Sequence, residues 1–147
     1  MKNVERHKEI IMAKPLEVVK NVYARFAAGD IDGFLTLCAD NIEWVVNGPA
    51  NLEKCKAFKG HSGVQQFLDL LAGWEFSSFT PREFIVDGQT VVVLGEEAGT
   101  DKKSGIGFEN RWAHVFDVQG ERIVRFREFL CHWTDQQRPP AMSWNTR

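Results

Sequence analysis

The sequence predicts a single α+β domain in which one curved sheet and three helices enclose a pocket. Helical periodicity is confined to the first half of the chain, whereas the second half alternates apolar and polar residues with a period of two. Helices that come first and hairpins that come later are typical of α+β domains rather than of doubly wound sheets. The 147 residues suit one domain, so residues 1–147 are treated as one unit with a core at about 15–133 and a tail at 134–147.

The expected helices span residues 15–28, 31–38 and 63–73. Pro15 suits the first turn of the first helix, because its missing N–H would have no partner there anyway. Asp30 can cap the second helix through its carboxylate. His61 or Ser62 occupies the capping position of the third helix.

One strand is expected at residues 42–46 and a meander of four more at 79–86, 91–100, 106–118 and 123–133. Residues 50–59 are interpreted as an irregular loop. A long meander with helices on one face must curve around them. The resulting cone is the natural place for a ligand pocket.

Composition excludes several classes of function. The net charge of −2 offers no electrostatic footprint for nucleic acid or an anionic membrane. Three cysteines without a CxxC spacing argue against a disulfide framework and a zinc site. The charged N-terminus resembles no signal peptide, and no apolar run is long enough to cross a membrane, so a cytoplasmic location is expected. Neither a metal nor an organic cofactor is expected, and no nucleotide-binding or zinc-protease motif is present.

Alternation along the last two strands assigns two titratable residues to the inner face of the sheet. His114 belongs to the third strand of the meander and Glu128 to the fourth, so neighbouring strands would bring them together. Desolvation would raise the pKa of Glu128, and histidine titrates near neutral pH without help. The alternative is a buried pair that only fixes the sheet. Either Glu96 or Glu97 must also face inward, and the pattern does not decide which.

The segment 91–133 resembles the SnoaL-like branch of the nuclear-transport-factor-2-like superfamily, which includes ketosteroid isomerases, limonene epoxide hydrolase and polyketide cyclases. The resemblance rests on a Val-rich strand ending Gly-Thr, on the run at 107–116 (GFENRWAHVF) and on the run at 123–129 (IVRFREF). It implies a cone-shaped sheet wrapped by helices and a homodimer formed through the outer face of the sheet. It also implies that Glu128 matches an acid–base carboxylate, and that Asn47 matches a pocket asparagine of the epoxide hydrolases.

This chain departs from the named enzymes at several positions. The Arg-x-Asp pair of the epoxide hydrolases has no counterpart in residues 95–98, and Tyr23 is the sole tyrosine. Where relatives commonly end the last strand with an aspartate, this chain has Cys131 followed by His132.

We therefore expect an enzyme that acts on a small hydrophobic or polyketide-like molecule by cofactor-free acid–base chemistry, of isomerase, cyclase or lyase type, with Glu128 and His114 as catalytic residues. The alternatives are a carrier without chemistry and a dimerisation module whose cone is filled. The expected ligand-binding residues are Tyr23, Phe26, Trp44, Asn47, Phe67, Trp74, Asn110, Trp112, Leu130 and His132. In the tail, Met142 and Trp144 could plug the cone.

Overall fold

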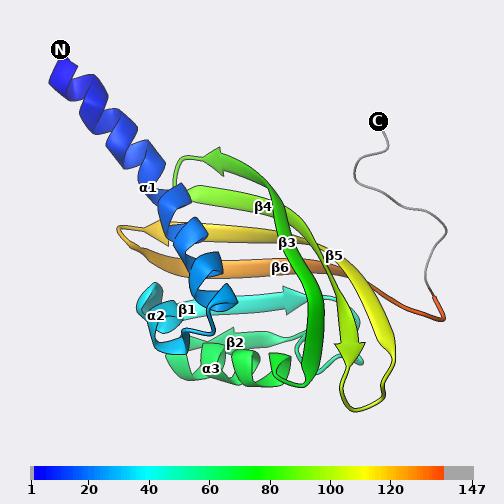
Figure 1. Cartoon of the computed structure of the whole chain (residues 1–147). Helices are drawn as coiled ribbons and strands as arrows, with labels where there is room; N and C mark the ends of the chain where they lie inside the picture. The colour runs from blue at the N-terminus through cyan, green and yellow to red at the C-terminus, as the bar shows by residue number, and fades with distance from the viewer. Residues whose placement is uncertain (1, 138–147) are drawn as a thin grey trace, which may run out of the picture.

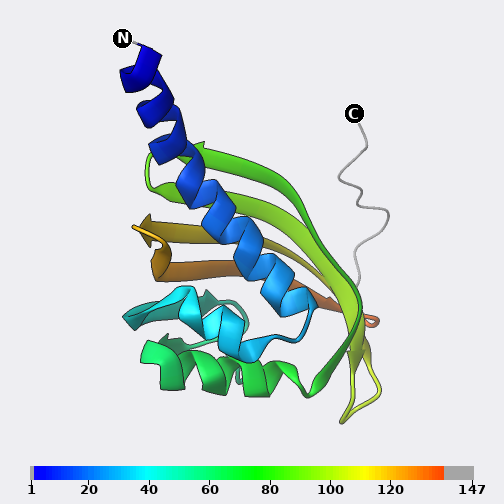
Figure 2. The ribbon, with the colours of Figure 1, turned by 60° about the vertical axis from the view of Figure 1, so that its left-hand side comes forward.

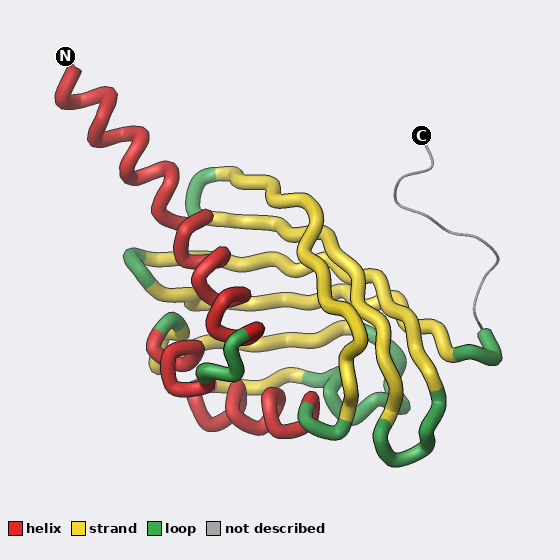
Figure 3. The backbone as a smooth tube through the Cα atoms, in the orientation of Figure 1, coloured by secondary structure: helices red, strands yellow, loops and turns green. Residues whose placement is uncertain are grey.

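The structure is a computed structural model that describes residues 2–137, so the expectation for Met142 and Trp144 lies outside the described residues. One curved sheet of six strands packs against three helices, as Figures 1 and 3 show. The elements are α1 (Lys2–Ala27), α2 (Ile31–Thr36), β1 (Cys38–Asn47), β2 (Ala57–Lys59), α3 (Gly60–Leu71), β3 (Trp74–Asp87), β4 (Thr90–Asp101), β5 (Gly107–Gln119) and β6 (Arg122–Thr134). Within the described residues, no helix combines the length and apolar character needed to cross a membrane.

The helix α1 starts at Lys2, so the prediction that it starts at Pro15 is wrong. Pro15 lies inside the helix and its side chain is fully buried. Its ring therefore packs against the domain, which offsets the backbone hydrogen bond that an interior proline forfeits. The apolar residues Val18, Val19 and Val22 follow on the buried face. Figure 2 shows this part of α1 crossing the sheet while the N-terminal turns extend past it.

The other two helices differ from the prediction at their ends. Asp30 caps α2 as predicted, because its Oδ1 accepts a hydrogen bond from the backbone N–H of Gly33 at 2.9 Å. The helix ends at Thr36, before the predicted Cys38. The helix α3 begins at Gly60, so His61 is not its cap. The His61 ring instead donates from Nε2 to the backbone carbonyl of Cys38 at 2.8 Å, which ties α3 to the start of β1.

The strand order is β2-β1-β6-β5-β4-β3. The predicted meander is confirmed as the antiparallel series β3 to β6, and β1 joins it by pairing in parallel with β6. Residues 57–59 form β2 against β1, so the end of the predicted loop is a strand. The edge strand β3 starts at Trp74, before the predicted residue 79. Two shifts of register in its pairing with β4 break the period-two pattern there.

The core lies between the sheet and the helices. Trp44 of β1 stacks on Phe126 of β6, with ring centroids 3.8 Å apart. Buried valines of β4 and rings of β5 complete the packing. The buried residues also include the charged or polar side chains Lys54, Glu97, Asn110, His114 and Glu128. Burial of a charge is costly unless the charge is paired, so this cluster marks the place to look for a site.

Candidate functional site

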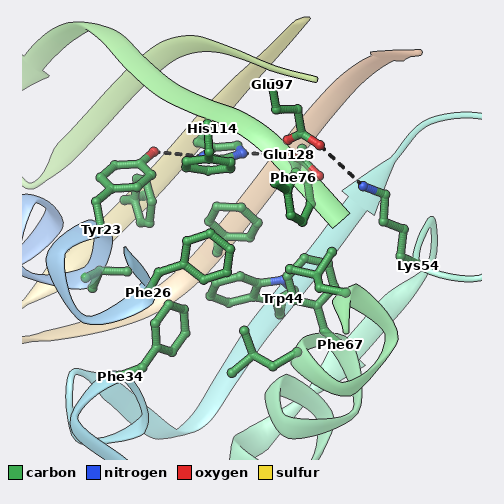
Figure 4. A pocket seen from close by; sticks show the side chains of 16 residues that line it. Tyr23, Phe26, Phe34, Trp44, Lys54, Phe67, Phe76, Glu97, His114 and Glu128 are labelled. Atoms are coloured by element: carbon green, nitrogen blue, oxygen red, sulfur yellow. Dashed lines mark hydrogen bonds and ion pairs between the residues drawn. The ribbon is translucent and has the colours of Figure 1, made fainter. Parts of the chain in front are cut away.

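A pocket lies in the cone between the sheet and the helices α1, α2 and α3 (Figure 4). It encloses about 490 Å³ of empty space, its open mouth included. The lining is largely apolar and aromatic, with five exceptions on one side. Those exceptions are Tyr23, Lys54, Glu97, His114 and Glu128. A mostly apolar pocket with a few fixed polar groups is typical of a small-molecule site.

A chain of hydrogen bonds connects α1 to the last two strands. His114 and Glu128 are directly opposite each other in the register of β5 and β6, as predicted. His114 Nε2 lies 2.6 Å from Glu128 Oε2, and His114 Nδ1 lies 2.7 Å from the Tyr23 hydroxyl. Figure 4 shows the three side chains in line along one wall of the pocket.

The proton positions in this chain follow from the chemistry of its ends. Burial, and secondarily the charge of Glu128, raise the pKa of Tyr23 far above its ordinary value, so the phenol keeps its proton. When His114 is protonated on Nε2 alone, the Tyr23 O–H donates to Nδ1, and when both ring nitrogens are protonated, Nδ1–H donates to the Tyr23 oxygen. The opposite ring nitrogen, Nε2, carries the proton that is donated to Glu128.

Glu128 is the acceptor at the end of this chain, and its pKa is lower than that of an ordinary glutamate. Burial alone would raise this pKa, but the charge and hydrogen bond of His114, together with the charge of Lys54, outweigh burial. The expectation of a raised pKa at Glu128 is therefore wrong, although desolvation acts in the expected direction. The carboxylate remains ionised at neutral pH.

The carboxyl group with the raised pKa is Glu97 on β4. Glu97 faces the pocket with 3% of its surface exposed, whereas Glu96 turns outward to pair with Arg82. Burial, with a further contribution from the charge of Glu128, raises the pKa of Glu97 to about 7, although Lys54 and the Asn110 hydrogen bond act in the opposite direction. Glu97 is therefore present in both protonation states near neutral pH.

Lys54 completes the polar wall from the loop between β1 and β2. Its side chain is 3% exposed, and its Nζ lies 3.8 Å from Glu97 Oε2 and 4.6 Å from the centre of the Trp74 ring. Sequence reasoning missed this residue because the segment 50–59 was interpreted as an irregular loop. The only signal was the apolar character of Leu52 and Cys55 beside it, both of which pack against the core.

The ring of Trp112 supports His114 from behind. The two rings stack with centroids 3.7 Å apart and planes 6° apart. A Cβ atom at Gly95 would lie 2.2 Å from Cη2 of Trp112, so only a glycine leaves room for the indole in this position. The orientation of His114 is thus fixed by Tyr23, Glu128 and a stacked ring together.

The predicted ligand-binding residues fall into three groups. Tyr23, Phe26, Trp44 and Phe67 line the pocket beside His114 and Glu128. Trp74 and His132 line a second pocket. Asn47, Asn110, Trp112 and Leu130 line neither.

Two of the last group are tied to the protein itself. Asn47 donates from Nδ2 to the backbone carbonyl of Glu128 at 3.1 Å, which links the end of β1 to the middle of β6. Asn110 is fully buried and joins Glu97 to His132. In the described part of the chain, no three His, Cys, Asp or Glu side chains gather in a way that could hold a metal ion.

Residues 19–126 match the family model of the SnoaL-like domain, a stretch that runs from α1 into β6. The chain belongs to the SnoaL-like domain family. The resemblance drawn from residues 91–133 is thereby confirmed. A search of curated proteins found no match to this SnoaL-like domain.

Solved structures agree with the assigned family. An NTF2-like protein from Burkholderia xenovorans LB400 is 26% identical with a TM-score of 0.75, over 82% of this chain and 91% of that one. TerC, co-crystallised with polyporic acid, is also 26% identical, with a TM-score of 0.71 over 80% of this chain and 92% of TerC. A protein with a ketosteroid isomerase-like fold from Catenulispora acidiphila, in complex with trimethylamine, has a TM-score of 0.63 over 77% of this SnoaL-like domain and 84% of that chain. At 17% identity it shares the fold alone.

Proposed function

We propose that this SnoaL-like domain is a cofactor-free enzyme that moves protons on a small, largely apolar molecule, in an isomerisation or a cyclisation. The observation that carries the proposal is the polar wall of an otherwise apolar pocket. Two buried carboxyl groups with opposite pKa shifts, Glu97 and Glu128, lie on that wall with a histidine and a tyrosine. Carboxyl groups whose environments separate their pKa values are a frequent arrangement in acid–base sites.

Glu97 is the group proposed to exchange the proton with the substrate. A pKa of about 7 lets it give or take a proton at neutral pH with little energetic penalty. Abstraction of a proton next to a carbonyl would leave the electron pair on the substrate oxygen as an enolate. The proton would stay on Glu97 until it is returned at another carbon.

The chain from Tyr23 to Glu128 is proposed to stabilise that oxygen. In the form of the site in which both nitrogens of His114 are protonated before the substrate reacts, Nδ1–H donates to the Tyr23 oxygen, and the phenol O–H is free to donate to the substrate. The ionised Glu128 stabilises the resulting imidazolium at 2.6 Å. The proposal therefore gives Glu128 a positioning role, and gives Glu97 the acid–base role that the sequence had suggested for Glu128.

The apolar walls favour a ring-bearing substrate. Phe26, Phe34, Trp44, Phe67 and Phe79 present aromatic surfaces to the pocket. The likeness to TerC, which was co-crystallised with polyporic acid, supports a small organic ligand.

The test measures proton exchange without requiring the natural substrate. A panel of aryl ketones in D₂O is followed by proton NMR for loss of the signal next to the carbonyl. The wild-type protein should accelerate exchange of at least one ketone, and Glu97→Gln should abolish it. Glu96→Gln is the matched control, because its side chain faces the opposite side of the same strand. Equal exchange by Glu97→Gln and the wild type would refute the role of Glu97.

A carrier function is the second candidate. It is favoured by one observation, namely that Glu128 is already paired with His114, whose ring packs against Trp112 and Phe126. Saturable binding of the ketones with no exchange by the wild-type protein would select this reading.

We also propose a homodimer through the outer face of the sheet. Phe129 of β6 lies on that face with 48% of its surface exposed, which is unusual for a phenylalanine. Analytical ultracentrifugation should show a dimer for the wild type and a monomer for Phe129→Glu.

A further inference from the structure

A second pocket opens where the turn between β4 and β5 meets the end of β6. The space inside it and in its open mouth amounts to about 440 Å³, and none of its lining residues lines the first pocket. Rings make up much of its wall. Trp74 meets Phe108 edge-on with centroids 4.7 Å apart, and Phe108 stacks on His132 with centroids 6.1 Å apart. This wall suits a flat ring.

The hydrogen bonds of Asn110 determine which nitrogen of His132 carries a proton. Asn110 Nδ2 donates to Glu97 Oε2 at 3.0 Å, so its Oδ1 is left as an acceptor. That oxygen lies 2.6 Å from His132 Nδ1, which must therefore be the protonated nitrogen. Asn110 is fully buried and cannot exchange these partners for water.

The other nitrogen of the ring is left to accept. Burial, and secondarily the charge of Lys54, lower the pKa of His132, so the ring is neutral at pH 7. In a neutral imidazole with a proton on Nδ1, Nε2 carries a lone pair. No hydrogen bond to Nε2 is formed within residues 2–137, and the ring lines the second pocket.

We propose that the second pocket is a binding site for a small phenol, whose ring lies against Trp74 and Phe108 and whose O–H donates to His132 Nε2. The ligand must donate a hydrogen bond, because the proton of the His132 ring is held on Nδ1 and Nε2 can only accept. The ligand should carry a ring, because aromatic side chains form part of the pocket wall. The proposal does not rest on the chemistry proposed for the first pocket. Leu52 and Ile106 supply the remaining apolar surface.

The experiment uses the full chain with ¹⁵N-labelled histidine, and the probes are phenol and its methyl ether, anisole. The spectrum of His132→Gln assigns the His132 signals. Without ligand, His132 Nε2 should show the shift of an unprotonated ring nitrogen. Phenol should move this signal saturably, whereas anisole, which has the ring but no donor, should leave it in place.

His114 provides an internal control, because phenol that entered only the first pocket would move the His114 signals instead. A proton on His132 Nε2 in the free protein would overturn the proposal. So would equal effects of phenol and anisole, or no change at His132 up to the solubility limit of phenol.

A second pair of variants tests the site without altering its buried groups. Asn51 lines the second pocket from an exposed position, so Asn51→Trp should fill it and weaken phenol binding at least tenfold. Glu53→Trp places the same ring in the same loop at an exposed position that lines neither pocket, and should bind phenol as the wild type does. Equal phenol affinity in the two variants would contradict the assigned place of binding.

Discussion

His114 Nε2 and Glu128 Oε2 are 2.6 Å apart, on side chains that are 6% and 5% exposed. This short contact decides the charge state of the site, because without it burial would drive a proton onto Glu128. A buried pair of this kind is weak evidence for stability, since desolvation offsets the attraction. Loss of one partner, however, leaves the other buried without compensation, and this asymmetry makes the pair testable.

His114→Phe should reverse the effect of pH on Glu128. In the wild type the lowered pKa stabilises the fold above the ordinary glutamate pKa, and this contribution is lost as the pH falls through the folded value. Without His114, burial dominates and the folded pKa lies above the unfolded one. The variant should therefore lose stability relative to the wild type as the pH rises from 5 to 8, as measured by urea unfolding. A constant difference across that range would contradict the role assigned to His114.

Glu97→Gln should stabilise the domain relative to the wild type at high pH, because it removes a buried carboxylate. With a folded pKa of about 7, Glu97 holds its proton more tightly in the folded chain than in the unfolded one. Ionisation of Glu97 therefore lowers the free energy of unfolding progressively from about pH 4.5 to about pH 7. At about 1.36 kcal/mol for each unit of pKa shift, the total is about 3 kcal/mol. Over that pH range, the free energy of unfolding measured with urea should rise in the variant relative to the wild type. Glu96→Gln should show no such rise.

Lys54→Met should raise the pKa of Glu97 and of His132 together, and that of Glu128 with them. Lys54 lowers the pKa of Glu97 by stabilising its carboxylate, and lowers the pKa of His132 by repelling its imidazolium. Loss of the buried cation should therefore shift both titrations upward in carboxyl ¹³C and imidazole ¹⁵N NMR. Lys56→Met, at an exposed position in the same loop, should leave both in place. A rise in the pKa of only Glu97 or only His132 would contradict the position of the Lys54 ammonium group near both.

Gly95→Ala should destabilise the domain by about 1–3 kcal/mol, the usual cost of overpacking. Its Cβ would lie 2.2 Å from Cη2 of Trp112 and 2.7 Å from the carbonyl oxygen of Thr80, so the indole must move off His114. Thermal unfolding and the Trp fluorescence spectrum should both change. Gly73→Ala is the matched control, because its Cβ would meet only the Leu70 carbonyl at 3.4 Å. Equal effects of the two substitutions would exclude the proposed clash.

The meander was predictable because its turns and its period of two fix the register of neighbouring strands. That register places His114 opposite Glu128, which agrees with the prediction that neighbouring strands bring the two residues together. The same logic failed for Glu96 and Glu97, since the strand before them reads Val-Val-Val-Leu and both of its faces look apolar. Alternation carries no information where every residue is hydrophobic.

The electrostatics of the site could not be predicted for a different reason. The pKa of a buried carboxyl depends on which atoms point at it, and sequence spacing gives faces but not orientations. Burial of Glu128 was foreseen, yet the sign of its shift comes from one ring nitrogen. Lys54 was missed because its burial depends on how a loop folds over the core, which no local pattern records.

Asn110 has a further consequence for the relation between the two pockets. An amide has a donating end and an accepting end, so its bonds to Glu97 and His132 have a fixed direction. A molecule that draws electron density from the His132 ring makes Nδ1–H a stronger donor to Asn110, which in turn makes Asn110 a stronger donor to Glu97. Reciprocity requires that the proton affinity of Glu97 and the ligand affinity at His132 change each other by the same factor. The buried amide thus couples ligand binding in the second pocket to the protonation of Glu97 in the first.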